Sequence, residues 1–241
     1  MSRDHCIDPN NKAVYSEALE VLIDSGVPFV IGGAFAVHFY TDLWRDTRDM
    51  DVFVTPENVQ PAIDALLGAG FANYGEMAAG DNEWIFHGRK RDIMVDVIWK
   101  FANRITVIGQ EWIDEAERGE FLGYPVAFAP LEELIYSKLF TLNRHRCDWP
   151  DIIRLIQNDV RPVQWDHLLR MVGEHWLLLA GLIDVFDWEL PPKMDLVPEH
   201  IRRELRRRRE QYHPEPGLVS REELLDPWVH TRKEDVCVSG L

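Results

Sequence analysis

The stretch from Val30 to Phe53 decides the expected fold. It opens as Val30-Ile31-Gly32-Gly33-Ala34-Phe35-Ala36-Val37 and closes as Arg45-Asp46-Thr47-Arg48-Asp49-Met50-Asp51-Val52-Phe53. The apolar residues before the glycines predict a strand, those after them a short helix, and the closing residues a second strand. Because successive side chains of a strand point to opposite faces, Asp49 and Asp51 are expected on the same face, a few ångströms apart.

This pattern predicts a polyphosphate held at a metal site. Two carboxylates at that separation raise each other's pKa, and a divalent cation between them is the usual solution in a folded protein. Gly32 and Gly33 let the backbone approach a ligand, and the amides that open the next helix can point at an anion. The alternatives are an ordinary turn at the glycines and a solvated strand end at the aspartates.

A third carboxylate, Asp96, lies in the middle of Asp92-Ile93-Met94-Val95-Asp96-Val97-Ile98-Trp99. The apolar residues around it predict a strand, in which an unpaired charge costs on the order of several kcal/mol. A metal shared with Asp49 and Asp51 would supply the partner. The alternative is a buried arginine, for which the chain offers Arg45, Arg48, Arg89 and Arg91.

The order and spacing of these motifs resemble the polymerase-beta-type nucleotidyltransferase superfamily. The motifs are Gly-Gly at 32–33, Arg-x-Thr-x-Asp-x-Asp at 45–51 and the distant strand residue Asp96, and the resemblance covers roughly residues 10–160. The small bacterial branches with antibiotic and toxin-like nucleotidyltransferases look most similar. The resemblance implies Mg²⁺- or Mn²⁺-dependent transfer of a nucleoside monophosphate from a nucleoside triphosphate to an acceptor hydroxyl, with release of pyrophosphate.

The resemblance also implies roles for individual residues. Asp49, Asp51 and Asp96 would be the catalytic and metal-binding residues, with Asp96 as the proton acceptor if a base is needed. The residues implied to bind the nucleotide are Gly32, Gly33, Arg45, Thr47, Lys138 and Arg144. The superfamily often has serine where this chain has Gly33, so a hydroxyl contact to phosphate would be lost.

The role of Lys138 and the arginines after it has an alternative. The segment resembles an element of the superfamily's second lobe, in which a helix lysine and an arginine-rich turn precede an Asp pair. The resemblance implies that Lys138 reaches the nucleotide phosphates, with Arg144 or Arg146 helping. In the alternative, Lys138 is solvated and Arg146 pairs with Asp148 or Asp151. The acceptor stays open among a small hydroxyl compound, a protein side chain and an RNA end, because cleft shape and not transfer chemistry selects it.

Composition narrows the function classes. The chain has 241 residues, 46% of them hydrophobic and 28% charged, and a net charge of −15, which argues against a broad nucleic-acid-binding surface. Residues 1–10 lack the apolar core of a signal peptide, and the longest apolar run, 176–183, is too short to span a bilayer. Together with scattered Cys6, Cys147 and Cys237, this predicts a cytoplasmic protein with reduced thiols and no membrane contact.

The chain as a whole predicts an α/β (α+β) fold: a mixed-sheet nucleotidyltransferase core followed by a small C-terminal helical lobe. We expect the core in 1–128, the lobe in 129–213 and an extension in 214–241. The core elements are predicted as helices at 11–25, 34–40, 55–67 and 111–118, strands at 29–31, 83–87, 91–99 and 121–128, and a strand within 45–53 that carries Asp49 and Asp51. A hairpin turn is expected at 88–90, and 121–128 is expected as an edge strand because Pro125 interrupts it. The helices of the lobe are predicted at 131–142, 149–157, 163–172, 176–188 and 198–211.

Two further hypotheses concern partners. The arginine-rich stretch 201–210 is interpreted as a solvated helix face or as a patch for RNA, an acidic partner or a second copy, so a homo-oligomer is conceivable. The alternative to an enzyme is a non-catalytic nucleotide-binding or toxin–antitoxin-type interaction protein on the same fold. Haloacid-dehalogenase phosphatases are disfavoured because Phe53 occupies the position of their threonine. Metal-dependent glycosyltransferases are disfavoured because only 48 residues precede Asp49.

Overall fold

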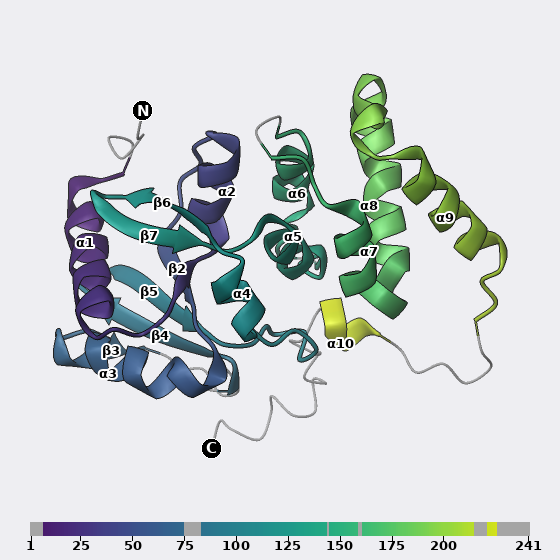
Figure 1. The fold of residues 1–241 in the computed structure, drawn as a ribbon. Helices are drawn as coiled ribbons and strands as arrows, with labels where there is room; N and C mark the ends of the chain where they lie inside the picture. Colours follow the sequence, from purple (N-terminus) through teal and green to yellow (C-terminus); the bar gives the residue numbers. More distant parts are fainter. Residues whose placement is uncertain (1–6, 75–82, 144, 159–160, 215–220, 226–241) are drawn as a thin grey trace, which may run out of the picture.

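The computed structural model describes residues 7–74, 83–143, 145–158, 161–214 and 221–225 (Figure 1). Within these residues, a seven-stranded mixed sheet has the order β3-β4-β5-β2-β1-β7-β6. The strands are β1 (Val30–Ile31), β2 (Asp49–Phe53), β3 (Ala72–Asn73), β4 (Ile85–Lys90), β5 (Ile93–Ile98), β6 (Glu117–Phe121) and β7 (Tyr124–Phe128). The mixed sheet with packed helices confirms the predicted fold class.

Four helices belong to the sheet half of the described chain: α1 (Pro9–Asp24), α2 (Gly33–Thr41), α3 (Val59–Gly68) and α4 (Gln110–Asp114). The side chain of Asp8 caps α1 by accepting from the Asn10 amide at 2.8 Å, and Pro9 occupies the first helical position. Helices α1 and α3 contact each other and pack against β5, whereas α2 links β1 to β2 and contacts α5 and α6. Helix α2 therefore joins the sheet to the helices that follow it.

The sheet brings the predicted carboxylates together through its register. Strand β2 runs parallel to β5, with Asp51 directly opposite Asp96, and antiparallel to β1. Strand β4 is antiparallel to β5 and sets His87 opposite Asp96. Asp51 and Asp96, which are 45 positions apart in the order of the chain, thus become neighbours across adjacent central strands. The same pairing directs Met50 and Val52 of β2 into the core, where they are buried.

The second half of the described chain is helical, as predicted. Its helices are α5 (Leu131–Leu139), α6 (Trp149–Ile156), α7 (Trp165–Val172), α8 (Trp176–Glu189), α9 (Glu199–Glu210) and α10 (Glu222–Leu225). Figure 1 shows the sheet on one side of the molecule and α7, α8 and α9 on the other, with α5 between them. The larger of two buried apolar clusters runs from α1 and the sheet through α5 to α9, so it spans both halves of the described chain. The boundary at 128/129 stays a prediction.

The predicted hairpin turn at 88–90 is wrong. Strand β4 continues through Lys90, and the turn lies at Arg91 and Asp92, with Arg91 at a φ of 56°. Gly88 was interpreted as a turn residue, but it lies inside the strand, where an added Cβ would be 2.9 Å from the carbonyl oxygen of Val95. Close approach of the neighbouring strand is therefore what requires this glycine.

The predictions for 111–128 also need correction. The short helix ends at Asp114 and not at Arg118, and β6 begins at Glu117. Leu122 and Gly123, with φ angles of 54° and 84°, form the turn to β7. Strand β7 is not the edge, because β6 pairs with it on the outer side and β1 reaches it at Phe128. Pro125 is tolerated because it lies away from the single β1 contact.

None of the helices in the described part of the chain combines the length and apolar character that crossing a bilayer requires. Cys147 is exposed and has a free thiol. The other two cysteines lie outside the described residues.

Candidate active site

A cleft of about 350 Å³ lies where β2 and β5 face the helical half of the protein. Its walls come from β2, β4, β5, the loop at 101–103, α5, the segment after α5, and α10. The charged and imidazole-bearing residues that line it are Asp49, Asp51, His87, Asp96, Lys138, Arg146 and Asp148. The structure thus brings the three predicted catalytic aspartates together in one cleft.

A second cavity of about 500 Å³ shares a wall with the first. Asp49, Asp51, Arg146 and Asp148 line both cavities. The second cavity also includes the first turn of α2 at Ala34 and the loop before β2, which contributes two arginines and a threonine: Arg45, Arg48 and Thr47. One side of the carboxylate pair is therefore rich in cationic groups.

The surroundings of Asp51 disfavour the ionised form of its carboxyl group. Burial, followed by the neighbouring charges of Asp49 and Asp96, raises the pKa of Asp51 to about 7, although Arg146 and Lys138 act in the opposite direction. Burial disfavours the ionised form because it removes hydration, and the charges of Asp49 and Asp96 disfavour it by like-charge repulsion. A divalent cation is the ligand that would relieve all three effects.

We therefore predict that Asp51→Asn stabilises the metal-free protein. The shift in pKa corresponds to at most about 4 kcal/mol at neutral pH, and because Asp51 is only half-buried we expect a gain of about 1–2 kcal/mol in the free energy of unfolding. The raised pKa makes ionised Asp51 destabilising above about pH 4, so the gain should grow from pH 4 to pH 8. Urea unfolding in EDTA measures it.

The control for this prediction is Asp92→Asn. The Asp92 side chain is 93% exposed, in the hairpin turn, so its replacement should change stability by less than about 0.5 kcal/mol. A loss of stability for Asp51→Asn in EDTA would contradict the prediction.

The two glycines fit tightly under β2. The Gly32 amide donates to the Asp51 carbonyl oxygen at 2.9 Å, and a Cβ at Gly32 would overlap the ring of Phe53 at 2.1 Å. Gly33 has a φ of +53°, and a Cβ there would lie 1.6 Å from Asp51 Oδ2. A serine at position 33 would therefore collide with the Asp51 carboxylate. This close contact is a physical reason for glycine, and not serine, at position 33.

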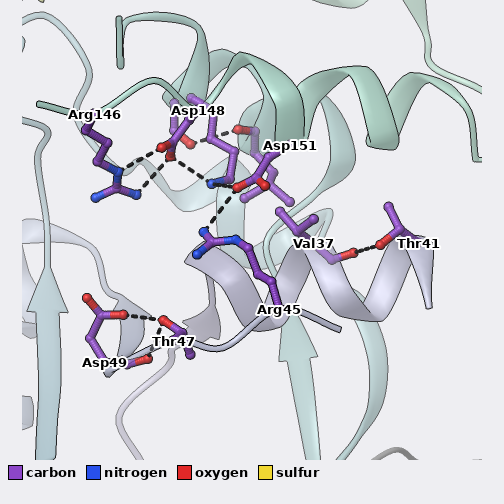
Figure 2. A network of polar contacts seen from close by, with 11 residues as sticks. Val37, Thr41, Arg45, Thr47, Asp49, Arg146, Asp148 and Asp151 are labelled. Atoms are coloured by element: carbon purple, nitrogen blue, oxygen red, sulfur yellow. Dashed lines mark hydrogen bonds and ion pairs between the residues drawn. The ribbon is translucent and has the colours of Figure 1, made fainter. Parts of the chain in front are cut away.

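Thr47 orients Asp49. Its hydroxyl donates to Asp49 Oδ1 at 2.6 Å, as Figure 2 shows. The third carboxylate has a neighbour that was not predicted from the sequence, because His87 Nδ1 lies 2.9 Å from Asp96 Oδ1. The missed signal was the hairpin register: a two-residue turn at 91–92 sets His87 opposite Asp96, whereas the predicted turn does not.

Lys138 is buried and not solvated. Its side chain is 4% exposed, and Nζ donates to Asp148 Oδ2 at 2.9 Å and to Asp151 Oδ2 at 2.8 Å. Arg146 donates to both oxygens of Asp148, from Nε at 2.7 Å and Nη2 at 2.8 Å. Arg45 Nη2 reaches Asp151 Oδ2 at 3.2 Å, which ties the loop before β2 to α6 (Figure 2). The alternative pairing of Arg146 with Asp148 is therefore what the structure shows.

Two further predicted features are Arg144 and the arginine-rich stretch 201–210. Arg144, predicted to bind the nucleotide, lies outside the described residues. Five of the six arginines of α9 form ion pairs within that helix and with α8: Arg202 and Arg206 with Glu199, Arg207 and Arg208 with Glu204, and Arg209 with Asp184. These pairs favour the interpretation of 201–210 as a solvated helix face.

The mixed sheet, the glycine-initiated helix and the carboxylate cleft define the class of nucleotidyltransferase-like proteins. Residues 12–183 match the model of a family described as uncharacterised nucleotidyltransferases, and the chain belongs to that family. No match was found among curated proteins.

Several solved structures are similar to this chain at low sequence identity, and one with a TM-score of 0.50 supports the fold. An antigenic nucleotidyltransferase-like protein from Paracoccidioides brasiliensis is 14% identical, with a TM-score of 0.50 over 79% of this chain and 94% of that one. The antibiotic-resistance factor ANT(2'')-Ia is 16% identical, with a TM-score of 0.46 over 82% and 100%. The lincosamide antibiotic adenylyltransferase LnuA, solved with lincomycin, is 16% identical, with a TM-score of 0.43 over 62% and 96%.

Proposed function

We propose that this protein is a metal-dependent nucleotidyltransferase that moves a nucleoside monophosphate from a nucleoside triphosphate to an acceptor hydroxyl and releases pyrophosphate. Membership of the family supports the class of reaction. The observation that carries the proposal is the convergence of Asp49, Asp51 and Asp96 in one cleft, with Asp51 and Asp96 opposite each other on parallel strands. Three carboxylates at one site are costly unless they serve a cation.

The donor set fits Mg²⁺ or Mn²⁺. All three candidate ligands are carboxylates, and hard divalent cations prefer oxygen ligands. Asp49 and Asp51 would hold both ions and Asp96 would complete the site of one. When bound, the ions would make the acceptor oxygen a better nucleophile and neutralise charge on the departing pyrophosphate.

The protein's own residues would orient the reactants. Thr47 holds the Asp49 carboxylate, and His87 holds Asp96, so that both keep one orientation when the substrate enters. Asp96 would take the proton of the acceptor hydroxyl if a base is needed. The network around Lys138 fixes α6 and the Arg45 loop against each other and so preserves the shape of the cavity behind the aspartates.

The triphosphate is proposed to lie in the arginine-lined cavity. Arg45, Arg48 and Arg146 supply cationic groups there, and the cavity meets the first turn of α2, where backbone amides favour an anion. Because the Gly32 amide already donates to Asp51, the phosphate contacts would fall to Gly33 and the residues after it. Lys138 would then maintain the shape of the site and not contact the phosphates, because two aspartates bind its ammonium group.

The acceptor is proposed to enter the other cavity. Its volume of about 350 Å³ suits a small molecule, and its apolar walls include Trp84, Phe101 and Phe140. A small hydroxyl compound is therefore the first class of acceptor to test. A cytoplasmic location, where nucleoside triphosphates are abundant, is part of the same proposal.

Calorimetry with ATP, GTP, CTP and UTP, each with Mg²⁺ or Mn²⁺, tests the proposal. We expect wild-type protein to bind at least one triphosphate only when metal is present, and Asp49→Asn/Asp51→Asn to lose that binding at least tenfold. Asp92→Asn, whose carboxylate is exposed outside the cleft, should bind like the wild type. No binding of any triphosphate by folded wild-type protein would instead favour the non-catalytic alternative.

A further inference from the structure

A second cluster of ionisable groups lies apart from the residues that line the cleft. Ligand atoms of Glu115, Glu133 and His167 all lie within 4.8 Å of one another. Glu115 directly follows α4, Glu133 belongs to the first turn of α5, and His167 belongs to the first turn of α7. The cluster therefore joins three helices that are separate in the sequence, one of the sheet half and two of the helical half.

Glu132 and Glu133 are neighbours with different environments. Both are 2% exposed. A Glu132 carboxylate oxygen accepts from the Gln164 amide at 2.6 Å, which satisfies the start of α7. Glu133 Oε1 lies 3.1 Å from His167 Nε2, but Glu133 Oε2 is buried with no hydrogen-bond partner among the described residues. A buried carboxylate oxygen without a donor is costly and calls for a ligand.

The charges around Glu133 also favour a cation. Burial raises the pKa of Glu133, and the hydrogen bond from His167 and the residue's own amide oppose that effect only in part. Glu115 adds a second carboxylate to the cluster. Arg161, on the segment before α7, pairs with Glu117. The cluster thus holds two carboxylates and one imidazole.

We propose that Glu115, Glu133 and His167 form a binding site for a divalent transition-metal cation, of which Zn²⁺ fits best, and that the bound ion joins the sheet half to the helical half. Imidazole and carboxylate are common Zn²⁺ ligands, whereas the imidazole disfavours Mg²⁺. Bonds of about 2.0–2.2 Å place tetrahedral ligand atoms about 3.3 Å apart, close to the separation of Glu133 Oε1 and His167 Nε2.

The site is accessible. Glu115 is exposed, so its carboxylate can rotate toward the other two ligands, and the His167 side chain is 31% exposed. A water molecule would be the fourth ligand of the ion. The proposal does not depend on nucleotide transfer, because it concerns a different set of residues from the aspartates of the cleft.

Zn²⁺ titration of chelator-treated full-length protein tests the proposal. In the Asp49→Asn/Asp51→Asn background, which removes the proposed cleft site, we expect one strong Zn²⁺ site by calorimetry and a rise of about 5–10 °C in Tm at a Zn²⁺ concentration about 100 times Kd, with no such rise for Mg²⁺. His167→Gln and, separately, Glu115→Gln should weaken Zn²⁺ binding at least tenfold. Glu115 is exposed, so its replacement keeps the test valid even if the His167 variant is unstable.

Two control variants locate the ion. His200→Gln removes an exposed histidine that lies 3.3 Å from Asp166, the residue before His167, and it should bind Zn²⁺ like the wild type. Asp49→Asn/Asp51→Asn should also keep the site. Unchanged Zn²⁺ binding in both His167→Gln and Glu115→Gln, loss of binding in the aspartate variant, or no Zn²⁺ binding by the wild type would overturn the proposal and leave a simple His–Glu ion pair.

Discussion

Replacing Lys138 by methionine is expected to lower the free energy of unfolding by about 3 kcal/mol and Tm by about 6–12 °C. Lys138 lies inside the protein, and its ammonium group is shared by Asp148 and Asp151, whose side chains are 7% and 16% exposed. Methionine fills a similar volume but leaves both carboxylates with one cationic partner each, Arg146 and Arg45. The larger part of the loss is therefore the penalty of two buried charges that are only partly compensated.

The dependence on pH gives this prediction a second readout. Burial raises the pKa of Asp148, but Lys138 and Arg146 more than offset that effect, so the pKa is lowered overall. A lowered folded-state pKa stabilises the protein above the unfolded value of about 4, and this contribution disappears as the pH falls through the folded-state value. The difference between wild type and Lys138→Met should accordingly be full at pH 7 and narrow below about pH 4.

Urea unfolding of both proteins across this range measures the effect, and Lys193→Met serves as the control. Lys193 is exposed and contacts Gln157 at 3.2 Å, so its loss should cost less than about 0.5 kcal/mol. If Lys138→Met unfolds like the wild type but binds nucleotide much more weakly, Lys138 reaches the phosphates, and the ion-pair interpretation is wrong.

The central part of the fold could be predicted because its signals are local. The apolar run, the glycine pair and the alternation around Asp49 and Asp51 each report on residues within a few positions, and β1, α2 and β2 follow them closely. The third aspartate was predicted from the cost of a charge between apolar strand residues. The pairing of β2 with β5 then places Asp96 opposite Asp51.

The features that could not be predicted depend on strand register and on the burial of side chains. Gly88 looks like a turn residue in the sequence, whereas packing against Val95 explains it, and the shift of the turn decides whether His87 meets Asp96. Likewise, the sequence shows that Lys138 is basic but not that α6 closes over it. Both features depend on contacts between segments that local patterns do not specify.

Gly33→Ala is expected to reduce nucleotidyl transfer at least about a hundredfold. The new methyl group would lie 1.6 Å from Asp51 Oδ2, so either the carboxylate or the start of α2 must move. A displacement of about 1 Å at a reacting centre can cost about a hundredfold in rate. The positive φ of 53° adds a backbone penalty of about 1 kcal/mol, because alanine rarely adopts that conformation.

Gly26→Ala separates the two effects. Gly26 also has a positive φ, of 70°, but no atom lies within 4 Å of its hypothetical Cβ, so this variant carries the backbone penalty without a collision. We expect both variants to lose stability and only Gly33→Ala to lose activity. Nucleotide binding by calorimetry then distinguishes the cause, because a displaced Asp51 weakens metal-dependent binding as Asp51→Asn does. Equal activity of the two variants would mean that the contact between Gly33 and Asp51 does not set the geometry of the site.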